Sequence, residues 1–150
     1  MEHREKASGH SPLRDCHCFN LRRATLAVTA FYDQHLKGAN VTSQQFAVMR
    51  HIKLQGPLSV TELSERMGLD RTTLSRNLTL LERRGLLTTE PSRGRQRLMT
   101  LTSNGEETFA FAMTRWEHAQ KELEDCLGVE QVEQLEKLLE KILNVHLTAK

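Results

Sequence analysis

The chain has 150 residues, of which 38% are hydrophobic and 27% are charged, and its formal net charge is +2 at neutral pH. This length and composition predict a single globular domain whose core needs no disulfide framework. No apolar run reaches the roughly 18 residues of a membrane helix and no apolar stretch follows the N-terminal charges, so we expect neither a membrane partner nor a secretory signal.

The first part of the chain predicts a polar tail and two helices. Residues 1–12 hold no apolar pattern, and we expect a flexible tail there, followed by one domain over residues 13–150. A helix is predicted at about 13–37, and its apolar positions cover more than one stripe, which indicates more than one neighbour. Thr42 and Gln45 have the spacing of a capping box, so a second helix is predicted from there to about Gln55.

Residues 59–84 predict two short helices joined by a tight turn. Ser59 and Glu62 form a second capping box, and Gly68 ends the helix at Met67 because glycine adopts the left-handed conformation easily. Asp70 is then the N-cap of a helix from Arg71 to Arg84. The apolar residues of that helix are spaced by four and three, the pattern of one buried face. The two helices therefore predict a helix-turn-helix. The buried residues of the second helix are predicted to be Leu74, Leu78 and Leu81.

A basic β-hairpin is predicted directly after the second helix. Leu86–Glu90 and Arg97–Leu101 flank a Pro-Ser-Arg-Gly turn, and residues 58–60 could add a short strand to them. Residues 71–97 hold seven arginines and two glutamates, a net charge of +5. A helix face with guanidinium, hydroxyl and amide groups suits the major groove, and arginines on a hairpin suit the backbone or a narrow minor groove. The alternative is a solvated basic face on an ordinary helical domain. The candidate DNA-binding residues are Arg71, Thr72, Thr73, Ser75, Arg76, Asn77, Arg93, Arg95 and Arg97.

The last third of the chain predicts two acidic amphipathic helices, at about 102–127 and 130–147. Residues 117–141 hold eight acidic residues and three lysines, a net charge of −5, so the two ends of the molecule differ in sign and the acidic helices should face away from DNA. The apolar stripes of these helices and of the helix at 13–37 have no partner in the short basic module. We infer a homodimer built from these helices, with a monomeric bundle as the alternative.

The stretch LSVTELSERMGLDRTTLSRNLTLLERRGLL, followed by a basic hairpin and LTSNG, resembles the MarR family of bacterial transcription regulators over about residues 13–147. The resemblance implies a mainly α fold with a small β-wing. It places a winged helix-turn-helix at about 42–101 and dimerisation helices at about 13–37 and 102–147. It also implies a small aromatic or phenolic ligand between the dimer helices and the winged module. Many family wings carry Asp-Arg-Arg where this chain has Arg93-Gly94-Arg95, so Arg95 inherits the groove-inserting role, with Arg93 as a substitute.

Three interpretations compete for the cysteines. Cys18 and Cys126 could be small core residues. A metal site is disfavoured, because Cys16-His17-Cys18 lacks the usual spacing of a cysteine loop. The third interpretation is redox sensing. CFNLRRATLAVTAFY resembles the first helix of the organic-hydroperoxide-sensing branch of the MarR family, which implies that Cys18 is a reactive thiol, Tyr32 its contact and Cys126 a resolving cysteine. Arg22 stands where that branch has a second tyrosine. Because Tyr32 lies about 21 Å along the helix from Cys18, it would have to come from the other subunit.

Two functions of different classes follow. The first is a cytoplasmic dimeric regulator, expected to be a repressor, that binds double-stranded DNA and is released by a small molecule or by thiol oxidation. The odd number of cysteines agrees with a reducing compartment. The second is a thiol-based peroxide-reducing enzyme. We favour the regulator because no catalytic set, cofactor motif or metal ligand set accompanies the thiols.

Overall fold

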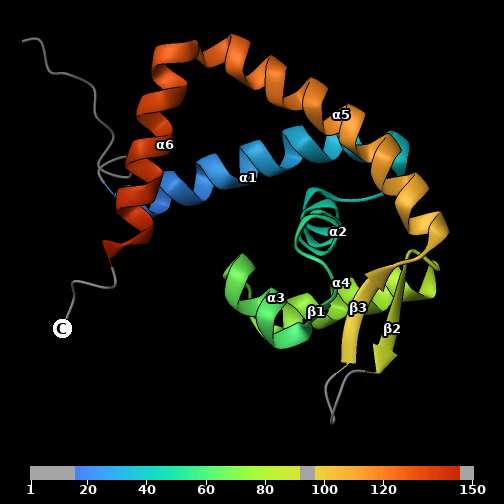
Figure 1. Cartoon of the computed structure of the whole chain (residues 1–150). Coiled ribbons are helices and arrows are strands. Elements are labelled where there is room, and N and C mark those ends of the chain that lie inside the picture. The colour runs from blue at the N-terminus through green and yellow to red at the C-terminus, as the bar shows by residue number, and fades with distance from the viewer. Residues whose placement is uncertain (1–15, 92–96, 146–150) are drawn as a thin grey trace, which may run out of the picture.

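The computed structural model describes residues 16–91 and 97–145. The predicted tail at 1–12, the wing-tip residues Arg93 and Arg95 and the end of the last predicted helix at Leu147 lie outside these ranges. Within them the chain forms six α-helices, one 3-10 turn and three strands (Figure 1). In chain order these are α1 (His17–Leu36), η2 (Lys37–Ala39), α2 (Ser43–Gln55), β1 (Leu58–Ser59), α3 (Val60–Met67), α4 (Arg71–Arg83), β2 (Leu87–Pro91), β3 (Arg97–Leu101), α5 (Ser103–Leu127) and α6 (Val129–Leu143).

The helix ends form where the capping residues predicted them. Thr42 and Ser59 each accept a hydrogen bond from the third helical residue, whose side chain accepts one from the cap's own backbone in return. Gly68 ends α3 with φ of 61°, in the left-handed region. Asp70 caps α4 by accepting from the backbone of Thr73 at 2.9 Å. The turn between α3 and α4 is therefore determined by local hydrogen bonds.

Three predicted boundaries are wrong. Cys16 has an extended backbone and α1 begins at His17, not at residue 13. Pro91 belongs to β2 and pairs with Arg97, although it was predicted to lie in the turn. It is the last paired residue of an edge strand, where a missing N–H is tolerated. The last helix begins at Val129, one residue before the predicted start.

The strands form one antiparallel sheet in the order β1-β3-β2, so the short strand suggested at 58–60 is confirmed. Leu58 pairs with Met99, and Leu87 pairs with Leu101 across the hairpin. The hairpin extends beyond α3 and α4 in Figure 1, beside the end of α4. It has the position of the wing in a winged helix-turn-helix.

The core lies around α2, which separates the helix-turn-helix from the long helices. In Figure 1, α1 and α5 run side by side on one side of α2, and α3, α4 and the sheet lie on the other. Leu36, Met49, Leu63, Leu74 and Leu81 are fully buried there. The packing of α4 on α2 fixes the direction in which the rest of α4 points.

The start of α5 is joined tightly to the base of the hairpin. The Thr102 hydroxyl donates to the carbonyl of Gly85, and the Thr102 N–H donates to the carbonyl of Leu86 at 3.1 Å. A Cβ on Gly105 would lie 2.0 Å from the Leu86 carbonyl oxygen, so only glycine allows this close approach. Helix α5 therefore begins in fixed contact with the hairpin and with the segment that follows α4.

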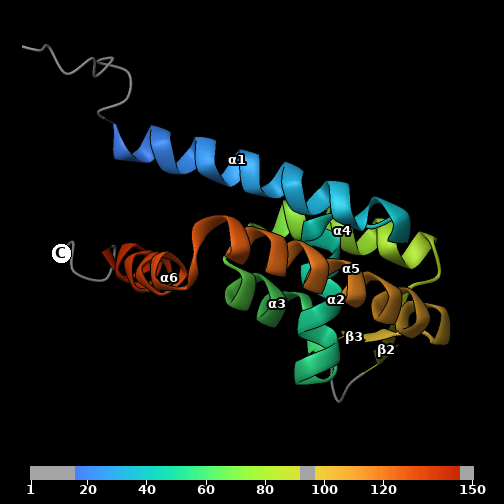
Figure 2. The same ribbon diagram turned by 90° about the horizontal axis from the view of Figure 1, so that it is seen from above.

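Helix α6 projects from the end of α5 and buries none of its residues (Figure 2). Its exposed apolar side chains include Leu135, Leu138, Leu139 and Ile142, which are 41–55% exposed. The start of α1 also exposes Phe19 and Leu26. These faces lack a partner among the described residues of the single chain, as the sequence indicated. Among those residues, no helix combines the length and apolar character needed to cross a membrane.

Candidate nucleic-acid interface

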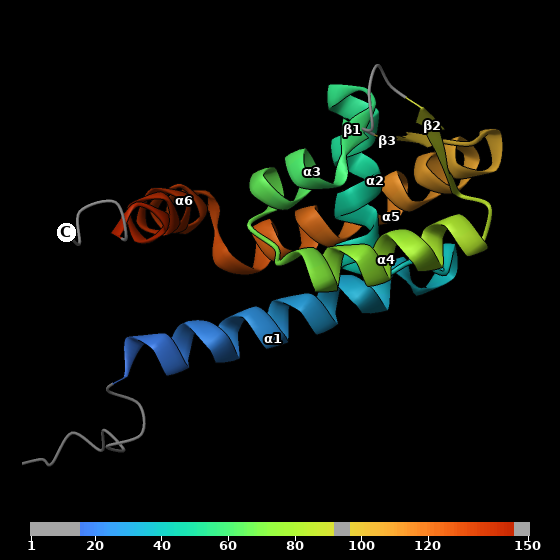
Figure 3. The same ribbon diagram turned by 90° about the horizontal axis from the view of Figure 1, so that it is seen from below.

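Helix α4 lies on the surface of the module and is anchored by its inner face. Leu74, Leu78 and Leu81 are at most 3% exposed and pack into the core. Figure 3 shows α4 running along the lower surface of the molecule, between α3 and the end of α1. Its outer face is open to solvent.

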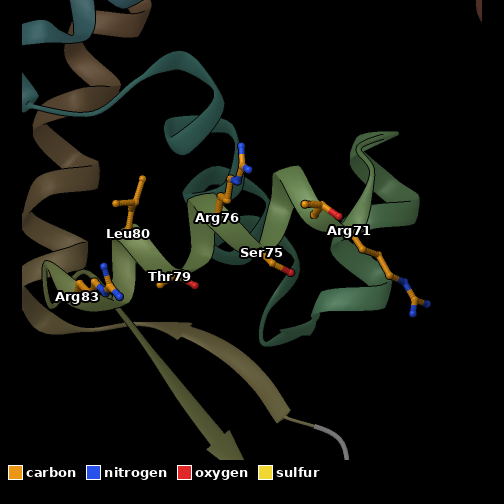
Figure 4. A pocket seen from close by; sticks show the side chains of 7 residues that line it. Arg71, Ser75, Arg76, Thr79, Leu80 and Arg83 are labelled. Carbon is orange, nitrogen blue, oxygen red and sulfur yellow. The ribbon is translucent and has the colours of Figure 1, made fainter.

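The outer face of α4 forms a shallow groove of about 590 Å³ that carries three arginines and three hydroxyl groups but no carboxylate (Figure 4). These residues recur every three or four positions, so they share one side of the helix. A guanidinium can donate two hydrogen bonds to guanine, and a hydroxyl can bond to several base edges. The groove is lined by Arg71, Thr72, Ser75, Arg76, Thr79, Leu80 and Arg83.

Thr73 and Asn77, both predicted to contact DNA, do not line this groove. The Asn77 amide donates to Gln44 Oε1 of α2 at 2.7 Å and to the Thr73 carbonyl at 3.1 Å. The Thr73 hydroxyl donates to Asp70 at 2.6 Å, and the hydrogen bonds from the Thr73 hydroxyl and backbone lower the pKa of Asp70. Both side chains are half-buried and hold α4 in place. We therefore assign them to positioning the helix and leave them out of the proposed interface.

The structure adds Thr79, Leu80 and Arg83 to the candidate face. Their spacing from Arg76 is three, four and seven residues, so the helical period alone could have identified them. Arg97 is exposed on β3, beside the hairpin end. Arg93 and Arg95 lie outside the described residues, so their predicted contacts stay predictions.

A second hollow, of about 390 Å³, lies where α1, α2 and α4 meet. Two cations line it, Lys37 of η2 and Arg84 at the end of α4, and neither has a carboxylate oxygen within 4.0 Å among the described residues. Leu80 lines both this hollow and the outer groove of α4. The hollow therefore touches the DNA-reading helix directly. Its lining residues are Asp33, Lys37, Asn40, Val41, Thr42, Gln45, Leu80 and Arg84.

The three cysteines are all exposed and unpaired, so in this chain Cys18 and Cys126 are not core residues. Cys18 is the second residue of α1, and Cys126 is the penultimate residue of α5. The Tyr32 hydroxyl donates to Gln120 Oε1 of the same chain at 2.6 Å, and burial raises the pKa of Tyr32. This hydroxyl therefore has its acceptor on α5 of the same chain, and the predicted contact of Tyr32 with a thiol stays a prediction.

The helix-turn-helix packs its inner face into the core and leaves a basic face of its second helix open to solvent. With the hairpin beside it, this arrangement defines a winged helix-turn-helix protein. The comparisons with known proteins agree. The MarR family model matches residues 39–98. The transcriptional regulator FarR of Neisseria gonorrhoeae is 30% identical over 112 residues, which are 73% of this chain and 77% of FarR.

Two solved structures match nearly the whole chain. The Mycobacterium tuberculosis regulator MosR in complex with DNA is 29% identical, with a TM-score of 0.74 over 86% of this chain and 96% of MosR. The transcriptional repressor CouR bound to p-coumaroyl-CoA is 25% identical, with a TM-score of 0.82 over 89% of this chain and 95% of CouR. The chain belongs to the MarR family of transcription regulators.

Proposed function

We propose that the protein is a homodimeric repressor that reads double-stranded DNA with the outer face of α4 and contacts the DNA backbone with the wing. The observation that carries the proposal is the outer groove of α4, where Arg71, Arg76 and Arg83 stand without a carboxylate. The similarity to MosR, solved with DNA, supports the nucleic acid as partner. The similarity to CouR supports repression. DNA as the partner implies a cytoplasmic protein.

The exposed apolar faces support the dimer. Leu138 and Leu139 of α6 are 55% and 41% exposed, and burying the exposed part of each is worth about half of the roughly 1.5–3 kcal/mol that full burial of such a side chain gives. A helix without any buried residue gains little from folding alone, so α6 needs a partner. In this arrangement the acidic late helices lie away from DNA.

The first experiment recovers the DNA that the protein binds across the genome of its source, and then measures binding to the recovered sequence as a function of salt. The affinity should fall steeply with salt, because each phosphate contact releases counterions. Arg97→Ala should flatten the logarithmic slope by about one unit. Arg23→Ala is the matched control, because it removes the same charge from an exposed position on α1. Equal slopes for both variants would show that the wing does not contact DNA.

A small molecule is one candidate signal. The hollow between α1, α2 and α4 would hold it, since Lys37 and Arg84 offer charge and Leu80 offers apolar contact. CouR is bound to p-coumaroyl-CoA, which supports an aromatic or phenolic effector here. Such a ligand would touch α4 and weaken DNA binding. Titration with a panel of phenolic acids should release DNA from the wild type and not from Arg84→Ala. Release from both proteins would place the ligand elsewhere.

Thiol oxidation is the second candidate signal, and the exposure of Cys18 and Cys126 supports it. Cys18 lies in the first turn of α1, and a peroxide reacts with the thiolate form of a cysteine. Oxidation to a sulfenic acid and reaction with Cys126 of the partner subunit would then link α1 to the late helices. Since the family and the relatives reported above are regulators, we propose that the protein is not a peroxide-reducing enzyme.

A further inference from the structure

A groove on the outer side of α5 is not used by the DNA-reading face. It lies between α1 and α5, has a volume of about 270 Å³ and is lined by His35, Phe111, Thr114, Arg115 and His118. The four α5 residues are exposed, whereas Phe109 and Ala112 on the other side of the helix are buried. In Figure 1, α1 and α5 lie across α2 from α3 and α4. A ligand in this groove would therefore not compete directly with DNA.

The Arg115 guanidinium is held in position but has no counterion. Its central carbon lies 4.9 Å from the ring centre of Phe111. The guanidinium also lies close to Gly38, where an added Cβ would be 2.6 Å from the same carbon. No carboxylate oxygen of the described residues lies within 4.0 Å of Arg115. The fold thus places a cation close to a ring and a glycine, with no carboxylate partner within 4.0 Å among the described residues.

The hydrogen bonds of His35 require a second positive charge at the groove. Its Nδ1 lies 3.0 Å from the Phe31 carbonyl oxygen, and its Nε2 lies 3.0 Å from Glu122 Oε2. A carbonyl and a carboxylate only accept hydrogen bonds, so both ring nitrogens must carry a proton. His35 in this arrangement is an imidazolium whose donors are occupied and whose counterion is Glu122. It contributes charge to the groove but no donor to a ligand.

The remaining donors are Arg115 and His118. The Thr114 hydroxyl already donates to the Phe111 carbonyl at 2.8 Å. Arg115 and His118 are three residues apart, so they reach the groove from neighbouring positions on one side of α5. A carboxylate has two oxygens, and the guanidinium fork would occupy both of them. A phosphate group has a third terminal oxygen that can accept from His118.

We propose that this groove binds the phosphate group of a small metabolite, with the Arg115 guanidinium and the His118 imidazole as its hydrogen-bond donors. The site joins α1 to α5 and is separate from the DNA-reading groove. This proposal does not depend on the proposed function.

The test is calorimetric titration of the full-length protein, in a buffer without phosphate, with inorganic phosphate as the probe and acetate as the comparison. The wild type should bind phosphate at least about tenfold more tightly than acetate, and Arg115→Ala should weaken phosphate binding by about tenfold or more. Gly38→Ala should also weaken it, because the new methyl group displaces the guanidinium but meets only a flexible side chain. Circular dichroism establishes that each variant is folded.

Two controls make the result specific. Arg76→Ala removes a cation from the DNA-reading face and should leave phosphate binding unchanged. Loss of binding in Arg76→Ala with retention in Arg115→Ala would overturn the proposal, because the phosphate would then occupy the DNA site. Equal affinity for acetate and phosphate would also overturn it, since it would indicate a carboxylate site. Absence of phosphate binding by the folded wild type would overturn it outright.

Discussion

The outer face of α4 is proposed to contact DNA, and its half-buried residues are proposed to hold the helix in place. Two neighbouring substitutions, Arg76→Ala and Asn77→Ala, test these two roles. Arg76 is exposed in the outer groove, whereas Asn77 is half-buried and bonded to Gln44. We expect Arg76→Ala to change DNA recognition with little effect on stability. Asn77→Ala should lower the stability of the fold and change DNA recognition little. Although the two residues are adjacent in sequence, they point about 100° apart on the helix.

The magnitudes follow from the contacts. Asn77→Ala removes two hydrogen bonds, each worth about 0.5–1.5 kcal/mol, so the free energy of unfolding should fall by about 1–3 kcal/mol. For a chain of this size that lowers Tm by roughly 2–4 °C per kcal/mol. Arg76→Ala should change the free energy of unfolding by less than about 0.5 kcal/mol. A lost base contact should weaken binding to the best sequence by about 1–3 kcal/mol and relax the choice of base at that position.

The assay combines thermal unfolding with selection from a randomised operator library, and unfolding is compared at one protein concentration because a dimer's Tm depends on it. If Asn77→Ala relaxes base choice and leaves Tm unchanged, then Asn77 faces DNA and the hydrogen bond to Gln44 does not hold the helix. If Arg76→Ala lowers Tm as much as Asn77→Ala does, the assignment of the outer face is wrong.

Three further outcomes are expected. Leu139→Asp should turn the dimer into a monomer or an aggregate in sedimentation, since it places an unpaired charge in the proposed interface; a wild-type dimer would refute that interface. An organic hydroperoxide should release DNA from the wild type but not from Cys18→Ser or Cys126→Ser in a gel-shift titration, and release from Cys18→Ser would leave the ligand as the signal. The hydrogen bonds of His35 to the Phe31 carbonyl and then to Glu122 raise its pKa. The stability that protonated His35 contributes is fully present below the ordinary pKa of histidine and is lost as pH rises through the raised pKa of His35 in the folded protein. The Tm difference between wild type and His35→Gln should therefore shrink from pH 6 to pH 9. A constant difference would contradict this.

Features determined by neighbouring residues could be predicted from the sequence. The caps at Thr42, Ser59 and Asp70 need only a side chain and a backbone N–H three residues away, so their spacing was sufficient. Gly68 likewise ends α3 through its own conformation. The helix-turn-helix followed from these caps and from the apolar period of the helices. The winged fold class was implied by the resemblance to the MarR family, and the comparisons confirm it.

Features determined by distant contacts could not be predicted. Asn77 looked like a base-reading residue, but Gln44, which is 33 positions away in sequence, takes its amide. Tyr32 matched a sensor motif, yet its hydroxyl is bonded to Gln120 of α5. Pro91 suggested a turn, but its position at the end of an edge strand removes the penalty for its missing N–H. In each case the contact depends on a partner that the residues next to it in sequence do not reveal.

The junction at Gly105 and Thr102 makes α5 a lever for the DNA-reading module. Because the helix is joined to Gly85 and Leu86, which follow α4 directly, we expect a tilt of α5 to move α4 with it. A helix of 25 residues is about 37 Å long, so a tilt of about 5° displaces one end by roughly 3 Å. The rise of one base pair is about 3.4 Å. A change of a few degrees between α5 and its partner would thus shift a recognition helix by one step along the operator.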